Sequence, residues 1–333
     1  LTAVATCAMA TLLTFLGRTL YQHRPFNDDD EAHIRRVSDG APVAAAANPG
    51  LRVIPGFVAA EEMDEVASCA RELLDRYGRS HLRPRDKAFF ESQMSHLTKS
   101  ERPFMNAERV TGRFERPDQP LAPWGHGDDF DADALPAVLR KLAARARATI
   151  NRSCDDQERT PLPALGPLRD VTINRRRDGY FRLDPHLDPA KDGPNVCIVG
   201  LLSDTVLTLS KVGPPDSTTC DQEAVSMHSW DPEDLDVLAE IGCLVHLSGR
   251  ARTELHHGIR LGVSRRQLSE AGVDVDGDAT LYDWWGAPAR PIKRNDERIS
   301  IVFAFGDPYL PVGEWVVAGL SEGLFEAFCA LFS

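Results

Sequence analysis

Asn174-Arg-Arg-Arg-Asp-Gly-Tyr-Phe-Arg-Leu-Asp-Pro-His186-Leu-Asp188-Pro189 is the stretch that decides the fold. Residues two apart on a strand point to the same side, so His186 and Asp188 can offer an imidazole nitrogen and a carboxylate oxygen to one metal ion. His257 would complete a set of two histidines and one carboxylate, which leaves positions open on a non-haem iron(II) ion. The sequence therefore predicts a metal centre of this kind.

A chain with ten histidines and fifty acidic residues contains His-x-Asp pairs by chance, so this pair alone is weak evidence for a metal centre. A second stretch, Arg298-Ile-Ser-Ile-Val-Phe-Ala-Phe305, supports the prediction. Arg298 and Ser300 share one face of this stretch, and the other face is formed by Ile299, Ile301, Phe303 and Phe305. This alternation is typical of a strand. Arginine is rarely buried without a partner, and its rigid fork suits a carboxylate. A bound dicarboxylate would supply that partner for Arg298.

Together these residues resemble the AlkB-type branch of the iron(II)/2-oxoglutarate-dependent dioxygenases. The resemblance runs from about Val171 to Phe305 and includes Asn-x-x-x-x-Gly, His-x-Asp, Gly249-Arg-Ala-Arg-Thr-Glu-Leu-His-His-Gly-Ile259 and Arg-x-Ser. It implies a mostly β fold with flanking helices (α+β) on a double-stranded β-helix, or jelly-roll, core. It also implies roles for seven residues: His186, Asp188 and His257 as iron(II) ligands, and Arg298, Ser300, Asn174 and Tyr180 in binding 2-oxoglutarate.

The third metal ligand has two adjacent candidates, His256 and His257. The family pattern places the ligand immediately before Gly-Ile. We therefore expect His257 to turn inward and His256 to lie outside the metal's immediate shell.

The chain departs from the family pattern at two positions. Arg176 stands where relatives carry a tyrosine that contacts the keto acid, and Ala304 stands where many carry a second arginine. Tyr180 either replaces the missing contact or the contact is absent. We expect binding of the keto acid to rest on Arg298, Ser300 and the iron, and we expect Arg294 to lie in a polar turn before the last strand.

The activity that the resemblance implies is hydroxylation, or oxidative demethylation, of a substrate C–H bond by dioxygen, with succinate and carbon dioxide as co-products. Two alternatives stay open: a prolyl-hydroxylase-like 2-oxoglutarate enzyme, and a non-catalytic jelly-roll interaction module, which the two departures favour. The net charge of −12 disfavours duplex nucleic acid as the substrate, because duplex binding relies on a basic surface. A protein side chain, a lipid or a small molecule is favoured, although Arg175 to Arg177 and Arg83 to Lys87 could form a local basic patch. No feature indicates an oligomer.

The organisation that we expect along the 333 residues has three parts. Residues 1–50 form a targeting-like or anchor-like segment and a flexible linker (Asn27 to Pro49), residues 51–310 form the dioxygenase domain, and residues 311–333 form an apolar helix that packs on it. The first seventeen residues carry no charge, which leaves a targeting segment, a signal-anchor remnant and an amphipathic helix open. Seven cysteines without Cys-x-x-Cys spacing favour an intracellular, reducing compartment, with organelle targeting or membrane anchoring by residues 1–25 as an open alternative.

The elements that we expect begin with a strand at Leu51 to Val58 and a helix from Ala60 to Tyr77 that Gly78 ends. Between Arg79 and Asp129 no regular pattern is present, and the family resemblance implies a lid over the substrate there. A second helix covers Asp131 to Ile150. Six strands build the core: Val171 to Asn174, Arg182 to Asp188, Val196 to Leu201, Val206 to Leu209, Ile241 to Leu247 and Arg298 to Phe305. Cys197 and Cys243 are expected to be buried, and Trp284-Trp285 to cap a core.

Overall fold

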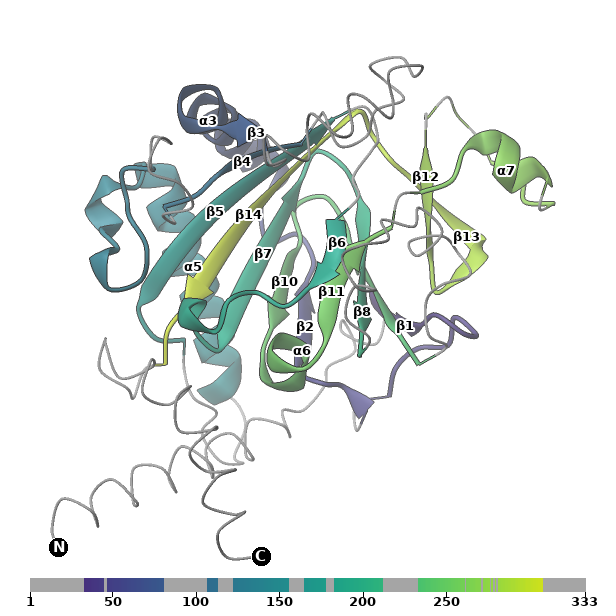
Figure 1. The fold of residues 1–333 in the computed structure, drawn as a ribbon, viewed down its shortest axis with the longest axis horizontal. Coiled ribbons are helices and arrows are strands. Elements are labelled where there is room, and N and C mark those ends of the chain that lie inside the picture. The colour runs from purple at the N-terminus through teal and green to yellow at the C-terminus, as the bar shows by residue number, and fades with distance from the viewer. Residues whose placement is uncertain are drawn as a thin grey trace, which may run out of the picture.

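The structure is a computed structural model that describes residues 33–44, 47–80, 107–112, 122–155, 165–177, 183–211, 233–260, 262–270, 272–275, 277, 279 and 281–307. Figure 1 shows two antiparallel sheets that face each other, with helices on the outer side of the larger one. Residues 1–32, the predicted helix at 311–333, the basic group Arg83 to Lys87 and Tyr180 lie outside the described residues. The division into three parts therefore stays a prediction.

The two sheets have the strand order of a jelly roll. The larger sheet contains, in order across it, β2 (Leu51–Ile54), β10 (Leu244–Leu247), β7 (Asn195–Leu201), β14 (Glu297–Phe305), β5 (Leu168–Arg177), β4 (Ala107–Val110) and β3 (Arg79–Ser80). The smaller sheet contains β1 (Ile34–Arg36), β9 (Leu235–Ala239), β8 (Thr205–Ser210), β11 (His256–Ile259) and β6 (Leu183–His186). From β5 to β14 the chain passes back and forth between the sheets, which is the winding of a double-stranded β-helix. The predicted fold class is confirmed.

Strand β14 lies at the centre of the larger sheet, with hydrogen bonds to β5 on one side and β7 on the other. One face of β14 packs toward the helices through Ile299, Ile301, Phe303 and Phe305. Its other face, with Val302 and Ala304, packs against residues of the smaller sheet. Burial of each large apolar side chain contributes roughly 1.5–3 kcal/mol, so the predicted alternation of β14 specifies which face meets which layer.

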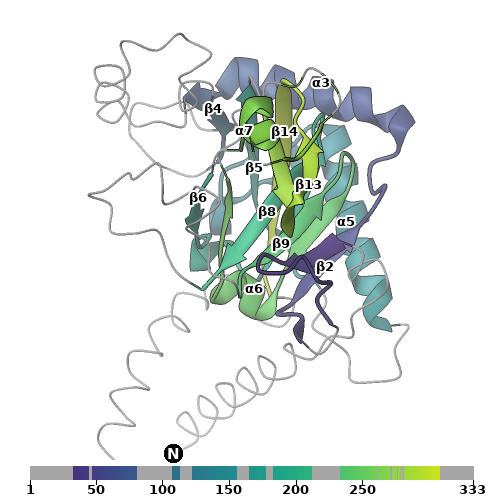
Figure 2. The ribbon, with the colours of Figure 1, turned by 90° about the vertical axis from the view of Figure 1, so that its right-hand side faces the viewer.

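Helices α3 (Ala60–Tyr77) and α5 (Ala137–Asp155) cover the outer face of the larger sheet. Figure 2 shows both helices flanking the strands. Val66, Ala70, Leu73 and Leu74 of α3 recur at helical spacing and are buried, and the helix has the bounds that the sequence predicts. Helix α5 begins later than expected, because the chain first makes short 3-10 turns and Pro136 then favours a helix start.

Several strands lie where the sequence predicts something else. β1 lies inside the segment expected to be a linker and pairs with β9. The sequence predicts neither β9 nor β11 as a strand. The expected strand from Ile241 begins only at Leu244, because Ile241 is exposed in a turn. Cys197 and Cys243 are buried, as expected.

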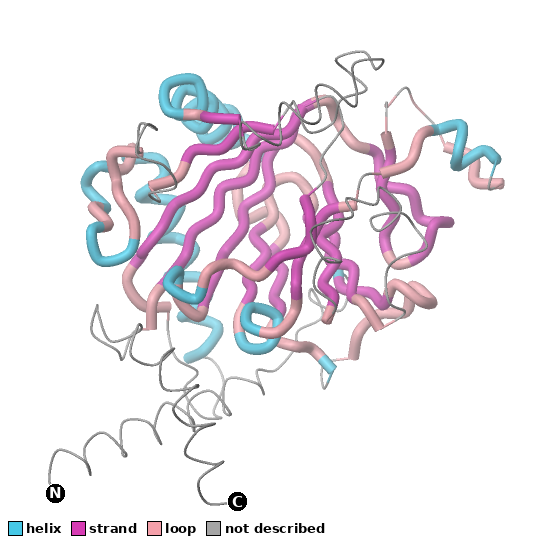
Figure 3. The backbone as a smooth tube through the Cα atoms, in the orientation of Figure 1, coloured by secondary structure: helices cyan, strands magenta, loops and turns pink. Residues whose placement is uncertain are grey.

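The segment between β11 and β14 contains helix α7 (Arg265–Glu270) and a hairpin of β12 (Tyr282–Trp285) and β13 (Ala287–Lys293). Figure 1 shows the hairpin beside the smaller sheet. It covers the face of that sheet that points away from the larger one, since the Asp236 side chain accepts a hydrogen bond from Gly286 of the hairpin while its neighbour Val237 packs between the sheets. Figure 3 shows how the helical segments lie at the margins around the strands.

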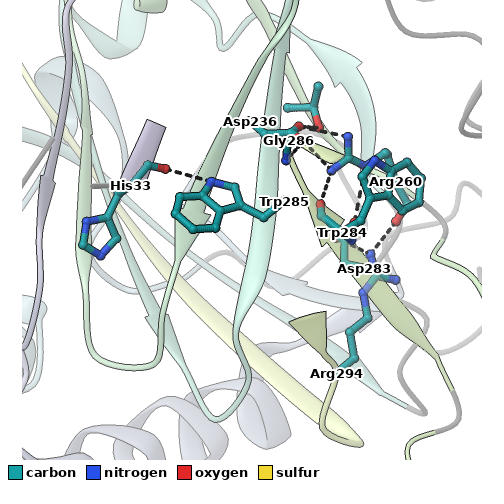
Figure 4. Close-up of polar contacts among 9 residues, drawn as sticks. His33, Asp236, Arg260, Asp283, Trp284, Trp285, Gly286 and Arg294 are labelled. Atoms are coloured by element: carbon teal, nitrogen blue, oxygen red, sulfur yellow. Dashed lines mark hydrogen bonds and ion pairs between the residues drawn. The ribbon is translucent and has the colours of Figure 1, made fainter. Parts of the chain in front are cut away.

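A buried ion network holds this hairpin to the smaller sheet (Figure 4). Arg260 donates two parallel hydrogen bonds of 2.9 Å to Asp236, and a weaker one of 3.3 Å to Asp283. Arg294 donates to Asp283 at 2.7 Å, and all four side chains are fully buried. Arg294 lies in the turn before the last strand, as the sequence predicts, but its side chain is buried against Asp283 and does not face solvent.

The Trp284 side chain covers Arg260 of this network, whereas the sequence predicts that Trp284 and Trp285 together cap a core. The guanidinium of Arg260 lies 4.0 Å from the centre of the Trp284 ring, which is only 3% exposed. Such a contact adds stabilisation when the cation is removed from water.

Among the described residues, no helix is long and apolar enough to cross a membrane.

Candidate metal centre and keto-acid pocket

Two neighbouring strands of the smaller sheet bring His186, Asp188 and His257 together. His186 ends β6 and is the direct cross-strand partner of His257 on β11, and Asp188 follows two residues later. The two imidazole rings are 4.4 Å apart, and the potential ligand atoms of the three residues all lie within 4.8 Å of one another. Each histidine Nε2 lies 3.7 or 3.8 Å from an Asp188 carboxylate oxygen, too far for a hydrogen bond. The three groups therefore surround one position, as metal ligands do.

The protonation state of His257 suits metal binding. Burial lowers the pKa of His257 to about 4, with smaller contributions in the same direction from His186, Arg252 and His256, while Asp188 opposes the shift. The ring is therefore neutral at neutral pH and offers a nitrogen lone pair. Two imidazoles and one carboxylate form the donor set that non-haem iron(II) sites use.

The two adjacent histidines of β11 point to opposite sides of the strand. His257 is 5% exposed and shares its side with Ile259, which packs between the sheets. His256 is more exposed and lies on the opposite side. The structure thus brings His257, and not His256, to His186 and Asp188. The role of His186, Asp188 and His257 as iron ligands stays a prediction.

Arg252, in the short helix α6 (Gly249–Thr253), fixes the backbone that carries Asp188. Its two terminal nitrogens donate to the carbonyl oxygens of Asp188 and Pro189, at 3.0 and 2.7 Å. Arg252 is itself buried. It belongs to the stretch that carries the resemblance, but no local pattern assigned it this contact.

We expect Arg252→Met to weaken metal binding by about tenfold, because groups that orient metal ligands typically contribute 10- to 100-fold to affinity. The measurement is an anaerobic iron(II) titration against a competing chelator. Arg250→Met is the matched control, since Arg250 lies on the same helix and makes only an exposed ion pair with Glu254. Equal affinities in the two variants would show that Arg252 does not position Asp188.

Three of the four residues predicted to bind the keto acid share one patch on the inner face of the larger sheet. Arg298 and Ser300 continue the side of β14 that faces the smaller sheet, and Asn174 of β5 is the direct cross-strand partner of Ser300. The fourth, Tyr180, lies outside the described residues. Arg176 is the cross-strand partner of Arg298 and completes the patch.

Arg298 is a buried cation without a counter-charge among the described residues. It is 4% exposed, and its Nε is buried with no hydrogen-bond partner. Burial, together with the guanidiniums of Arg176 and Arg294, lowers the pKa of Arg298 to about 9. An arginine in this state lacks an anion, and a carboxylate ligand fits it.

Comparisons with known proteins find similarity at the level of structure only. No protein-family model and no curated protein matches the chain. It is similar to the structure of OsALKBH1, with a TM-score of 0.45 and 15% identity over 77% of this chain and 98% of that one. It is also similar to a prolyl hydroxylase from Trichoplax adhaerens in complex with a peptide fragment of the hypoxia inducible factor oxygen degradation domain, with a TM-score of 0.40 and 10% identity over 78% and 84% of the two chains. Neither similarity assigns a role to a residue of this chain.

Proposed function

We propose that this protein is an iron(II)- and 2-oxoglutarate-dependent dioxygenase that hydroxylates, or oxidatively demethylates, a substrate C–H bond. The observation that carries the proposal is the convergence of two histidines and one carboxylate in a jelly roll whose inner face also presents Arg298, a buried arginine with no counter-charge among the described residues. A metal centre alone would suit many chemistries. The buried guanidinium of Arg298 on the same interior adds the need for an anionic ligand.

The donor set and the arginine both fit the proposed groups. His186, Asp188 and His257 would hold the iron(II) from one side, and Arg298 with Ser300 would hold the distal carboxylate of 2-oxoglutarate. When bound, the iron and the keto acid supply oxidation of a C–H bond by dioxygen, with release of succinate and carbon dioxide. The chain itself orients these groups and excludes water, because His257, Arg298 and Ser300 are all buried.

For the substrate we propose a protein side chain, a lipid or a small molecule in preference to duplex nucleic acid. The support is the net charge of −12, which repels a polyanion. A prolyl-hydroxylase-like reaction is compatible with the same site residues, and the identity of the substrate separates the two.

The test of the proposed function is turnover of the keto acid. Purified protein is incubated with iron(II), ascorbate and labelled 2-oxoglutarate, and succinate is measured with and without candidate substrates. Slow succinate release without substrate supports the dioxygenase. The absence of both turnover and iron uptake would contradict it and favour the non-catalytic interaction module.

We expect Arg298→Ala to weaken binding of 2-oxoglutarate by at least tenfold. Truncation of one partner in a desolvated charge pair costs roughly 2–5 kcal/mol, because the other charge is left without a counter-ion. Arg298→Lys should also lose affinity, since an ammonium cannot reproduce the bidentate fork. Affinity is measured by anaerobic titration of the iron-loaded protein, followed by visible absorption.

Arg71→Ala is the control for Arg298→Ala. Arg71 lies on α3 and forms a partly buried ion pair with Glu297, the residue next to Arg298. The control removes an arginine beside the same strand without touching its inner face. Unchanged affinity in Arg298→Ala would show that the keto acid binds elsewhere.

A further inference from the structure

The inner patch contains two arginines that face each other across neighbouring strands. Arg176 of β5 and Arg298 of β14 are direct cross-strand partners, and each is only 4% exposed. Like charges directly opposite on a sheet are destabilising. Because the same alternation places Asn174 and Ser300 beside them, the polar row lies on the face that meets the smaller sheet and not on the face that meets the helices.

The neighbouring arginine of β5 shows how this protein neutralises a structural arginine. Arg175 points to the opposite face, where it forms ion pairs with Glu108 and with Asp75 of α3. Arg298 has no such acid among the described residues, although the chain carries 50 acidic residues in all. Within the described residues, the folded protein thus keeps Arg298 buried without a counter-charge, at a cost in stability that is typical of a binding site.

We propose that Arg176 is a second keto-acid-binding residue, and that its guanidinium and that of Arg298 bind the distal carboxylate of 2-oxoglutarate together. This inference rests on the proposed function and names the contact that replaces the tyrosine of the family pattern. A carboxylate has two oxygens with about four acceptor positions, so it can accept hydrogen bonds from two guanidinium forks. Arg176 then supplies the second positive charge that Ala304 cannot, and binding of the keto acid does not rest on Arg298 and Ser300 alone.

The test compares two keto acids that differ only at the distal end. 2-Oxopentanoate has the chain length of 2-oxoglutarate but carries a methyl group in place of the distal carboxylate. Each is titrated by calorimetry into the iron(II)-loaded protein under nitrogen. We expect Arg176→Met to weaken 2-oxoglutarate by about tenfold to a hundredfold, the range for a hydrogen bond to a charged group, and to leave 2-oxopentanoate unchanged.

Arg177→Met is the matched control, because Arg177 is adjacent on β5, exposed, and directed to the opposite face near Glu108. Binding of 2-oxopentanoate shows that each variant is folded, and Arg176→Lys, which keeps the charge but loses the fork, serves if Arg176→Met does not fold. If Arg176→Met and Arg176→Lys keep the wild-type preference for 2-oxoglutarate while Arg298→Met loses it, the inference is overturned and the proposed function stands. Failure of the wild-type protein to bind either keto acid overturns the proposed function as well.

A second readout is the midpoint of thermal unfolding, measured first without ligand and then with 2-oxoglutarate. If the two guanidiniums repel each other in the ligand-free protein, Arg176→Met should raise its midpoint of thermal unfolding. The same variant should gain less than wild type on addition of 2-oxoglutarate, because a ligand stabilises in proportion to its affinity. A lower midpoint in the ligand-free variant would assign Arg176 to the scaffold and contradict the inference.

Discussion

His257→Ala should weaken iron(II) binding by more than about a hundredfold, since replacing even groups that only orient a metal ligand costs 10- to 100-fold. The same loss is expected for His186→Ala and Asp188→Ala. Two remaining donors cannot hold an ion on one side as three do. Affinity is measured by anaerobic titration of iron(II) against a chelator dye, with circular dichroism to show that each variant is folded.

His256→Ala is the matched control for this loss. It removes the same kind of side chain from the neighbouring position, where the ring points away from His186 and Asp188. We expect iron affinity to remain at the wild-type level. If His256→Ala empties the site while His257→Ala spares it, the third ligand is assigned to the wrong histidine.

Asp283→Ala should lower the free energy of unfolding by about 3–5 kcal/mol, the cost of removing one partner from a buried ion pair. Asp283 is fully buried and accepts from Arg294 at 2.7 Å and from Arg260 at 3.3 Å. Its loss removes the carboxylate that Arg294 and Arg260 both contact. Burial alone would raise the pKa of Asp283, but the guanidiniums of Arg294 and Arg260 outweigh it and hold that pKa below its usual value, so the carboxylate is charged at neutral pH.

Urea unfolding at neutral pH measures this change in stability. Glu254→Ala is the control, because its ion pair with Arg250 spans one exposed helical turn and contributes only about 0.3–0.5 kcal/mol. A loss in Asp283→Ala no larger than that of the control would show that the network does not hold the hairpin.

The sequence predicts best those strands and helices whose buried face is specified by residues within a single segment. In β14 the alternation alone separates the helix-facing side from the side with Arg298 and Ser300. In α3 the spacing of Val66, Ala70 and Leu74 specifies both the helix and its buried face. The three metal donors could be named for a related reason, since His-x-Asp places two of them within three residues, although β6 ends at His186 and Asp188 lies just beyond it.

What could not be predicted depends on partners distant in sequence. β11 contains two histidines and a glycine and no apolar alternation, so its strand conformation follows from pairing with β8 and β6. Arg294 has polar neighbours in sequence, and only the return of the hairpin places Asp283 against it. For Arg176 a local signal existed: it lies two residues after Asn174 and must share its face, but its opposite partner Arg298 comes from the register of the sheet.

The central place of β14 also determines the order in which the molecule can be assembled. Arg298 of β14 lies 122 positions after its cross-strand partner, Arg176 of β5. Among the described strands, β14 is the last to leave the ribosome. Until then β5 and β7 each present an open edge toward the other, and long-range pairing of this kind is slow and prone to aggregation. All three metal donors are thus synthesised before the strand that closes the sheet between β5 and β7. Iron encountered during translation would therefore meet its ligands before they have a rigid frame.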